Sequence, residues 1–544
     1  MSPLMTRQSP SGMPVQKYRP YEPIRLSDRT WPDRTLDHAP IWCSVDLRDG
    51  NQALIDPMGI PRKRRLFDLL VKMGFKEIEV GYPTSCQADW DFTRHVIEDD
   101  AIPDDVTVQV MTPIRDELID RTVQALAGAP RAILQIYNPT SPLQRRVVLG
   151  MSREQVMALA VRGAEQALRL RDSLPGTKIA LQYATESFSQ TEPEFALEVC
   201  NAVLRLWQPT PDDPARIVFP ATVECYPPME FADRIEWMHR HLQHRDAVLL
   251  TVHPHNDRGT GVAATEMALM AGAQRVEGTL FANGERAGNV CMVTLAMNLF
   301  SQGVDPQLDL SDIDDVRRIV EECYGMPVSP RHPWAGDFVY TSFAGPHQDA
   351  INKGLRRRAD SRAELWEVPY LPIDPHDVGR DYRALIRINT QSGKGGMTYL
   401  MRTEHGLDLP RRLQIEFAAV VQAESERSGE VTPDVLWSCF EREYLHPDDA
   451  ASPAEPVGDP QRHLDSLVRP HGVTATILEL HRQHRTGQRP SGCVSYAEVK
   501  VGDVVRWGAG IAPDPEAALT RCVRSAVRRA VAQAPAAGVD RPVH

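Results

Sequence analysis

The sequence predicts a (β/α)₈ barrel, followed by helical linker subdomains and a small α+β domain. In roughly the first half of the chain, eight short β-rich runs alternate with helical patterns. Eight β/α units within about 250 residues are typical of a closed parallel barrel. No glycine fingerprint for a dinucleotide follows the first run, which disfavours an open doubly wound sheet.

The eight runs are rich in β-branched and aromatic residues. They span residues 41–47, 77–82, 106–111, 132–137, 178–183, 219–225, 247–253 and 275–281. Amphipathic segments such as 62–73 and 153–173 separate most of them, as the helices of a barrel would. We therefore expect an N-terminal arm over residues 1–40 and the barrel over residues 41–310.

The alternation of strands and helices stops beyond residue 310. Residues 311–445 have helical patterns joined by loops, and we expect them to form linker subdomains. Residues 446–460 are rich in Pro, Ala and Asp, the composition of a linker. Residues 461–544 mix helical and strand patterns, which predicts a small separate α+β module.

Composition and charge exclude several classes of protein. Apolar residues make up 42% of the chain and charged residues 25%, as in ordinary globular proteins. The formal charge of −12 disfavours a nucleic-acid partner. No run reaches the roughly 18 to 20 apolar residues of a membrane span. Nine scattered cysteines, with no C-x-x-C pair, indicate a reducing compartment, so we expect a cytoplasmic protein.

Polar and potentially reactive side chains cluster where the predicted strands end. In a (β/α)₈ barrel the carboxyl ends of the strands meet on one face, and active sites form there. The clustering therefore predicts a single site at the barrel mouth. Its candidate residues are Arg48, Asp49, Glu186, Thr222, Glu224, His253, His255 and the segment 283–286.

Two histidines at the end of the seventh strand predict a metal site. His253 and His255 are two residues apart, so both imidazoles project to the same side of a strand. Asp49 follows the first strand, which lies close to the seventh and eighth strands in a closed barrel. Two histidines and one carboxylate are a common set of ligands for a catalytic divalent ion. A histidine pair alone is more often structural, and the barrel-mouth position favours the metal.

Longer motifs resemble a known family. These are residues 42–54, 143–147, 253–259, 283–286, 288–289, 347–351, 369–374 and 391–396. Together they closely resemble the longer class of 2-isopropylmalate synthases, of the alpha-isopropylmalate/homocitrate synthase family. The resemblance runs without interruption over residues 30–445, and its motifs are long enough to be specific.

The resemblance implies a fold, a reaction and an assembly. It implies a catalytic barrel, two linking subdomains and a C-terminal leucine-sensing domain, assembled as a homodimer. The implied reaction joins the methyl carbon of acetyl-CoA to a branched 2-oxo acid, either 3-methyl-2-oxobutanoate or a bulkier analogue. The products are a 2-alkylmalate and CoA, as in leucine biosynthesis. The implied cofactor is a divalent ion, Mg²⁺, Mn²⁺ or Zn²⁺.

The resemblance also assigns roles to individual residues. The family's metal ligands fall on Asp49, His253, His255 and Asn289. Its carbonyl-polarising arginine falls on Arg48, and its carboxylate-binding threonine falls on Thr222. The groups that deprotonate acetyl-CoA fall on Glu186, His347 and Tyr370. In the family a linking subdomain reaches the partner's active site, so we expect His347 and Tyr370 to act in trans.

Each of three assigned residues also has a plainer interpretation. Thr222 would then only satisfy a strand backbone, Tyr370 would be a core tyrosine, and His347 would cap a helix. The continuous match to the family favours the functional roles.

Departures from the family pattern lie around the pocket for the oxo acid. Gln135 stands where the family has histidine, Ala184 where it has serine and Val218 where it has asparagine. With Met111, these residues form the predicted pocket, which is more apolar than the family's. We therefore expect a different or bulkier 2-oxo acid, such as 3-methyl-2-oxopentanoate, with broad specificity. Ala282 replaces a family glycine in the segment before the metal-ligating asparagine.

The C-terminal segment departs most. Residues 461–544 are too short for both β-rich units of the family's regulatory domain, so we expect leucine inhibition to be weak or absent. This favours a specialised paralogue, for example in a natural-product pathway. Two rival hypotheses remain. One is a homocitrate-type, citramalate-type or reverse lyase enzyme, and the other is a catalytically silent partner subunit.

Overall fold

The computed structural model describes residues 10–342, 344–360, 364–380, 394–428, 431–445, 459–471, 473–485 and 492–532. It divides into two compact units, Met1–Gly336 and Asp337–His544. We describe each unit by itself. The predicted linker at 446–460 and the motif at 391–396 fall largely outside the described residues, which resume at Asp459 and Lys394.

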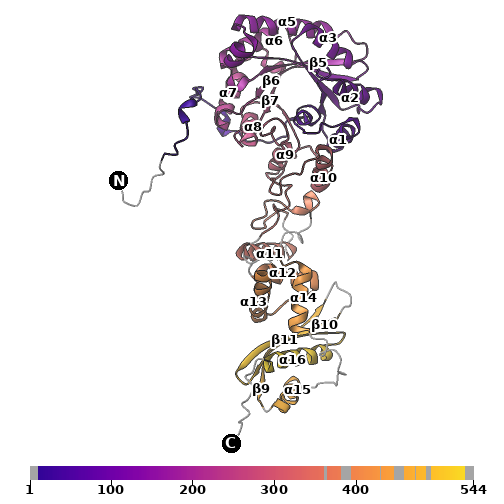
Figure 1. The fold of residues 1–544 in the computed structure, drawn as a ribbon, viewed down its shortest axis with the longest axis vertical. Coiled ribbons are helices and arrows are strands. Elements are labelled where there is room, and N and C mark those ends of the chain that lie inside the picture. The colour runs from indigo at the N-terminus through magenta and orange to yellow at the C-terminus, as the bar shows by residue number, and fades with distance from the viewer. Residues whose placement is uncertain are drawn as a thin grey trace, which may run out of the picture. The chain divides into compact units, whose positions relative to one another are not determined.

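The first unit is the (β/α)₈ barrel, and the prediction of this fold class is confirmed. Each strand pairs in parallel with the next, and β1 pairs with both β2 and β8, which closes the ring (Figure 1). The strands are β1 (Ile41–Ser44), β2 (Glu77–Gly81), β3 (Thr107–Pro113), β4 (Arg131–Pro139), β5 (Lys178–Glu186), β6 (Ala215–Ala221), β7 (Val248–Pro254) and β8 (Arg275–Gly278). They are buried almost throughout, as expected for parallel strands covered by helices.

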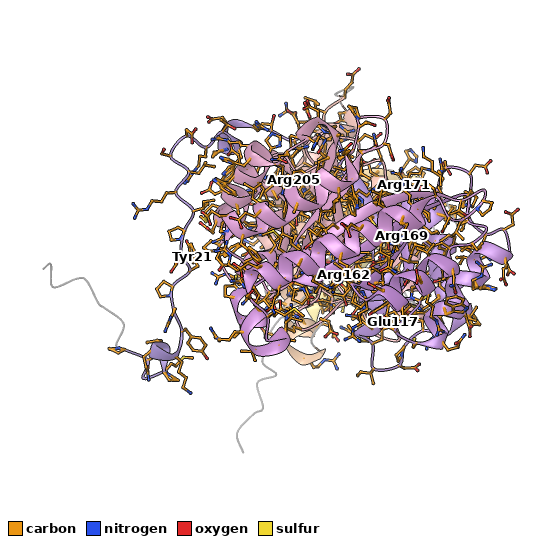
Figure 2. The ribbon with its side chains drawn as sticks, turned by 90° about the horizontal axis from the view of Figure 1, so that it is seen from above. Tyr21, Glu117, Arg162, Arg169, Arg171 and Arg205 are labelled. Carbon is orange, nitrogen blue, oxygen red and sulfur yellow. The ribbon has the colours of Figure 1, made fainter. Side chains whose placement is uncertain are left out.

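Helices surround the strands. They are α1 (Ile60–Met73), α2 (Gln87–Glu98), α3 (Asp116–Ala125), α4 (Pro142–Gln144), α5 (Arg153–Arg171), α6 (Pro193–Trp207), α7 (Pro228–His241), α8 (Gly261–Met270), α9 (Met292–Phe300) and α10 (Ile313–Tyr324). The longest, α5, begins at a capping box formed by Ser152 and Gln155. It buries small residues such as Ala160 and Ala164, whereas Arg162 and Arg169 lie on its exposed face (Figure 2). The small residues therefore form the face that packs on the barrel, and the arginines form the solvent face of an amphipathic helix.

The sixth strand lies four residues earlier than expected. We predicted residues 219–225, and β6 spans Ala215–Ala221. Its ladder with β7 begins at the pair Ala215 and Val248, and this pairing includes the β-branched residues before Phe219. The prediction failed because the position of a strand is set by its neighbours as well as by its composition. Thr222 therefore follows the strand instead of lying within it.

The N-terminal arm is held on the outside of the barrel from residue 24 onward. The backbone N–H of Ile24 donates to Glu230, and that of Thr30 donates to Glu236. Trp31 is buried, and its indole N–H donates to Asp233 at 2.7 Å. All three acceptors belong to α7, so this helix anchors the arm.

The second unit consists of helices followed by a small sheet. Its helices are α11 (Gly345–Asp360), α12 (Lys394–His405), α13 (Arg411–Ser428), α14 (Pro433–Tyr444), α15 (Pro460–Val468) and α16 (Pro515–Val531). The strands β9 (Ala475–Arg485), β10 (Gly492–Val501) and β11 (Val504–Ala512) form an antiparallel sheet in the order β11-β10-β9. Among the described helices of either unit, none is long and apolar enough to cross a membrane.

Helix α16 packs closely against β11 because two glycines leave room for it. A Cβ atom on Gly508 would lie 2.1 Å from the carbonyl oxygen of Cys522, and one on Gly510 would lie 2.2 Å from that of Ala518. Side chains at these positions would force the helix away from the sheet. This contact explains the two glycines of the 507–511 segment.

Candidate metal centre and substrate cavity

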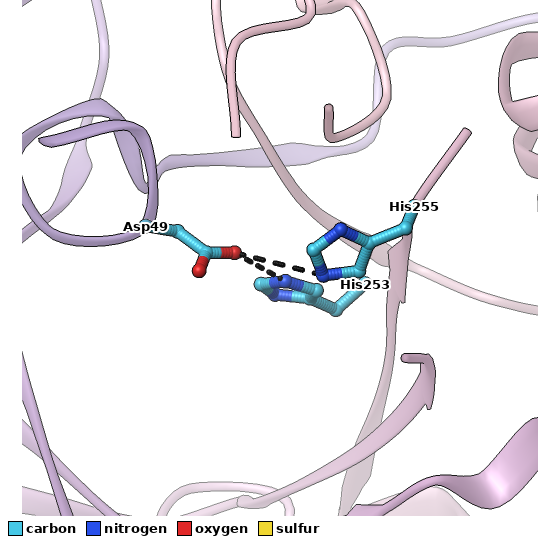
Figure 3. A group of neighbouring side chains, drawn as sticks. All are labelled: Asp49, His253 and His255. Carbon is cyan, nitrogen blue, oxygen red and sulfur yellow. Dashed lines mark hydrogen bonds and ion pairs between the residues drawn. The ribbon is translucent and has the colours of Figure 1, made fainter. Parts of the chain in front are cut away.

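The three side chains predicted as metal ligands converge at the mouth of the barrel (Figure 3). Asp49 lies in a one-turn π-helix, η3 (Asp46–Gly50), just after β1. His253 is near the end of β7, and His255 directly follows that strand. One ligand atom of each lies within 4.8 Å of the others. Asp49 Oδ2 is 3.0 Å from Nε2 of His253 and 3.8 Å from Nε2 of His255. All three residues are buried.

Asn289, the fourth ligand implied by the resemblance, lies against the same cluster. Its Nδ2 is 2.7 Å from Asp49 Oδ2 and 3.1 Å from His253 Nε2. Its Oδ1 is buried, and no hydrogen-bond partner for it lies among the described residues. Rotation of the amide by 180° turns this oxygen towards the cluster. Two imidazoles, a carboxylate and an amide oxygen form a donor set that fits a divalent ion.

Glu277, a residue that we did not predict, orients His253. Its Oε2 is 2.8 Å from His253 Nδ1, so the Nδ1–H donates to this carboxylate and the ring directs its Nε2 at Asp49. Burial lowers the pKa of His253, but hydrogen bonds with Asp49 and Glu277 raise it to about 9. Burial and the nearby His253 lower the pKa of His255 to about 4. The arrangement favours a cation between Asp49 and His253.

Arg48 fixes a positive charge beside the ligands. Its Nη1 donates to Asp49 at 2.7 Å, and its Nε donates to Glu79 at 2.7 Å. Burial alone would raise the pKa of Asp49, but the guanidinium of Arg48 and the two histidines hold it well below its usual range. Asp49 is therefore an anion at neutral pH, as its predicted role as a metal ligand requires.

A cavity of about 230 Å³ opens beside the cluster. Every residue that we predicted for the oxo acid lines it, together with the charged groups of the metal centre. These are Met111, Gln135, Ala184, Val218, Thr222, Glu186, Arg48, Asp49, His253 and His255. The walls therefore combine a charged side, from β1, β7 and β8, with a more apolar side from β3 to β6.

The cavity also includes residues that our sequence analysis did not select. They are Gln52, Tyr82, Tyr137, Pro220 and Glu277, whereas Glu285 and Arg286 belong to the predicted segment 283–286. Gln52 lies inside a motif that carries the resemblance, 42–54, and that position was a usable signal. Tyr82 and Tyr137 follow or end strands, so the convergence of strand ends could also have found them.

Glu186 and Thr222 both line the cavity. Glu186 is the last residue of β5 and is half-buried, and burial raises its pKa against the effect of a hydrogen bond with Gln144. The hydroxyl oxygen of Thr222 accepts a hydrogen bond from the backbone N–H of Ser187 at 2.9 Å. Because that oxygen is the acceptor, the hydroxyl proton remains available for a ligand.

His347 and Tyr370 belong to the second unit. Their rings stack with centroids 4.2 Å apart, so the structure brings these two predicted residues together. Both side chains are exposed, and Tyr370 is 61% exposed. The plainer interpretation of Tyr370 as a core residue is therefore wrong. The role of the pair in catalysis stays a prediction.

Comparison with known proteins identifies the family. The model of the HMGL-like family matches residues 39–320, and that of the alpha-isopropylmalate synthase post-catalytic domain matches residues 337–402. A 2-isopropylmalate synthase from Parafrankia sp. is 53% identical, and the match covers 97% of this chain and 99% of that protein. One from Mycobacterium ulcerans is 50% identical over 95% of this chain and 100% of that protein.

Among solved structures, a hydroxymethylglutaryl-CoA lyase from Pseudomonas aeruginosa is 16% identical, with a TM-score of 0.44. The match covers 55% of this chain and 97% of the lyase. The two curated relatives match nearly end to end, and the first family model spans more than half of the chain. This chain belongs to the 2-isopropylmalate synthase family, within the HMGL-like proteins.

Proposed function

We propose that this protein catalyses the condensation of acetyl-CoA with 3-methyl-2-oxobutanoate, which gives 2-isopropylmalate and CoA. It is then an acyltransferase that converts the acyl group into an alkyl group on transfer, and it serves leucine biosynthesis. One observation carries the proposal: the metal-ligand cluster, Arg48 and Glu186 open into one cavity. The family of the chain supports the same reaction.

The metal centre suits the oxo acid. A divalent ion held by Asp49, His253, His255 and Asn289 would supply a Lewis acid for the keto and carboxylate oxygens of the substrate. The imidazole nitrogens suit Zn²⁺ and the oxygen donors suit Mg²⁺ and Mn²⁺, so all three ions are candidates. Arg48 adds a fixed positive charge beside the carbonyl oxygen, where negative charge develops.

Glu186 is the candidate base. It takes a proton from the methyl group of acetyl-CoA, and the resulting carbanion attacks the keto carbon to form the new carbon–carbon bond. The keto oxygen becomes an alkoxide and takes up a proton to give a hydroxyl, and water then cleaves the thioester into a carboxylate and free CoA. Burial raises the pKa of Glu186, which makes it a stronger base than an exposed carboxylate.

Thr222 and the more apolar wall hold the oxo acid. The Thr222 hydroxyl, with its proton available, donates to the substrate carboxylate. Met111, Ala184 and Val218 surround the branched alkyl group. A dicarboxylic oxo acid would need an additional cation, and the Arg286 guanidinium at the cavity already pairs with Asp257 at 2.6 Å. This disfavours the homocitrate-type alternative.

The second unit completes the proposal. We propose that residues 311–445 form the linker, of which residues 311–336 belong to the first unit. We also propose that residues 461–544 form a shortened regulatory domain and that the chain acts as a homodimer. His347 and Tyr370, stacked and exposed, would then reach the partner's cavity and assist proton transfer. The described residues of the C-terminal domain hold one three-stranded sheet, which fits a single unit of the family's paired domain.

The proposal is tested by CoA release from acetyl-CoA with Mg²⁺ or Mn²⁺ across a panel of 2-oxo acids. The panel contains 3-methyl-2-oxobutanoate, 3-methyl-2-oxopentanoate, pyruvate and 2-oxoglutarate. We expect the highest kcat/KM with 3-methyl-2-oxobutanoate. A preference for 3-methyl-2-oxopentanoate would replace the substrate with the bulkier alternative. The absence of release with every acid would favour the silent-subunit hypothesis.

A further inference from the structure

Three buried glutamines connect the metal centre to the wall of the substrate cavity. Gln109 lies on β3, Gln135 on β4 and Gln182 on β5, and the last two are paired in register. All three are at most 5% exposed. The orientation of a glutamine amide decides which of its ends is a donor, and here the neighbouring charges fix that orientation.

Gln109 is fixed by ions on both sides. Its Oε1 accepts from the guanidinium of Arg275 at 2.7 Å. Its Nε2 donates to Glu277 at 3.0 Å and to Glu79 at 3.2 Å. A flipped amide would place two N–H groups against a cation and a carbonyl oxygen against two carboxylates. The observed orientation is therefore the only favourable one.

The orientation of the Gln182 amide is fixed by the carboxylate of Glu277. Its Nε2 lies 2.9 Å from Glu277 Oε1 and 3.2 Å from Gln109 Oε1, and it also donates to Oε1 of Gln135. Its own carbonyl oxygen is buried, with no hydrogen-bond partner among the described residues. The amide keeps this orientation because the flipped one would place its oxygen against the Glu277 carboxylate.

These constraints determine how Gln135 faces the cavity. Its Oε1 accepts a hydrogen bond from Gln182, so a 180° rotation of the Gln135 amide would place two NH₂ groups against each other. No protein acceptor for its Nε2 lies within the described ranges, and the residue lines the cavity. Gln135 therefore presents a hydrogen-bond donor to the ligand, on a wall where Met111, Ala184 and Val218 are apolar.

We propose that Gln135 donates a hydrogen bond to an oxygen of the bound 2-oxo acid, and that Gln182 is the positioning residue that aims this donor. The inference rests on the proposed function, because it takes the 2-oxo acid as the ligand of the cavity. The negative charge of Glu277 fixes the orientation of the Gln182 amide, and the Gln182 amide in turn fixes that of Gln135. The same carboxylate orients His253 through its other oxygen, so one buried anion aligns the metal ligand and the specificity residue.

The test is the steady-state kinetics of two matched substitutions, Gln135→Met and Gln182→Met, which keep side-chain length and remove the amide. Loss of a hydrogen bond to a charged acceptor raises KM by about tenfold to 100-fold. We expect such a rise in the KM for 3-methyl-2-oxobutanoate with Gln135→Met. A smaller rise is expected with Gln182→Met, in which Gln135 is intact but has lost the hydrogen bond from Gln182 that orients its amide. The KM for acetyl-CoA and the content of bound Mn²⁺ are expected to stay unchanged in both.

Two further variants separate donation from packing. Gln135→His retains a donor, and we expect a KM for the oxo acid within roughly threefold of the parent value. Gln135→Glu keeps the shape but replaces the donor with an anion, so its KM is expected to exceed that of Gln135→Met. A KM for Gln135→Glu at or below that of Gln135→Met would overturn the proposal. An unchanged KM in Gln182→Met would overturn the positioning role.

The control is Gln166→Met, which removes a buried glutamine of α5 that donates to the carbonyl oxygen of Asp116. This variant is expected to lower the melting temperature without raising KM. Calorimetric titration of the Mg²⁺-loaded protein with 3-methyl-2-oxobutanoate measures the same interaction without turnover. If the parent binds the oxo acid but releases no CoA, the proposed reaction fails while the binding series still decides the role of Gln135.

Discussion

Substitution of Glu277 by glutamine tests how the barrel interior supports the metal centre. Glu277 is fully buried and contacts His253, Arg275, Gln109 and Gln182. Glutamine keeps the shape and removes the charge. Loss of a partner that orients a metal-ligating histidine weakens metal binding by about tenfold to 100-fold. We therefore expect the dissociation constant for Mn²⁺ or Zn²⁺ to rise by that factor.

The same substitution also lowers stability. Arg275 is fully buried and pairs with Glu77 and Glu277, so it would retain one carboxylate instead of two. Removal of one partner from a buried ion pair costs about 3 to 5 kcal/mol. We expect the lower end, about 3 kcal/mol, because the amide oxygen still accepts from Arg275. Urea denaturation of the metal-free protein measures this loss.

Glu236→Gln is the matched control. Glu236 is also a buried carboxylate, and it accepts from Thr30, Trp31 and Arg240 on the outside of the barrel. Its substitution is expected to reduce stability without changing metal affinity. Metal affinity is measured by competition with a chromophoric chelator. If Glu277→Gln binds the metal as tightly as the parent, the argument that this carboxylate orients His253 is refuted.

Three further predictions concern catalysis, binding and stability. Glu186→Gln is expected to lower kcat by about 10²- to 10⁴-fold. In the parent, activity should fall as the pH drops through the pKa of Glu186, because only the deprotonated form is a base. Because burial raises the pKa of Glu186 above its usual value of 4.5, we expect this fall in activity above pH 4.5. A fall at or below pH 4.5, or one that persists in Glu186→Gln, would contradict the assignment. Thr222→Val is expected to raise the KM for the oxo acid about tenfold, with little change for acetyl-CoA, and equal effects on both would contradict carboxylate binding. Ala282 has a φ of +62°, so Ala282→Gly is expected to stabilise the metal-free protein by about 1 kcal/mol in urea denaturation, and a loss of stability would refute the strain.

The fold could be predicted because its signals are local. Each strand of the barrel carries its own β-rich run, and the amphipathic helices between them are periodic over many residues. The exception was β6. We predicted residues 219–225, but the strand starts at Ala215, where its pairing with β7 begins. Such a shift is a property of the ladder and not of the segment.

The core of the candidate site could be predicted because residue type and position at a strand end coincide, and the resemblance added Asn289 and the residues of the oxo-acid pocket. His253, His255 and Asp49 satisfied both conditions, and the structure brings them together. Glu277 and Gln182 did not, because their importance comes from contacts across the barrel interior. The 2.8 Å contact between Glu277 and His253 depends on how β7 and β8 pair, which composition does not reveal.

The most direct test of the account is product analysis before and after removal of the metal. The protein is incubated with acetyl-CoA and 3-methyl-2-oxobutanoate, and 2-isopropylmalate and free CoA are quantified by mass spectrometry. The account predicts equal amounts of the two products, loss of both after chelation, and recovery when Mg²⁺ or Mn²⁺ is restored. Full activity in the chelated protein, or CoA release without 2-isopropylmalate, would contradict it.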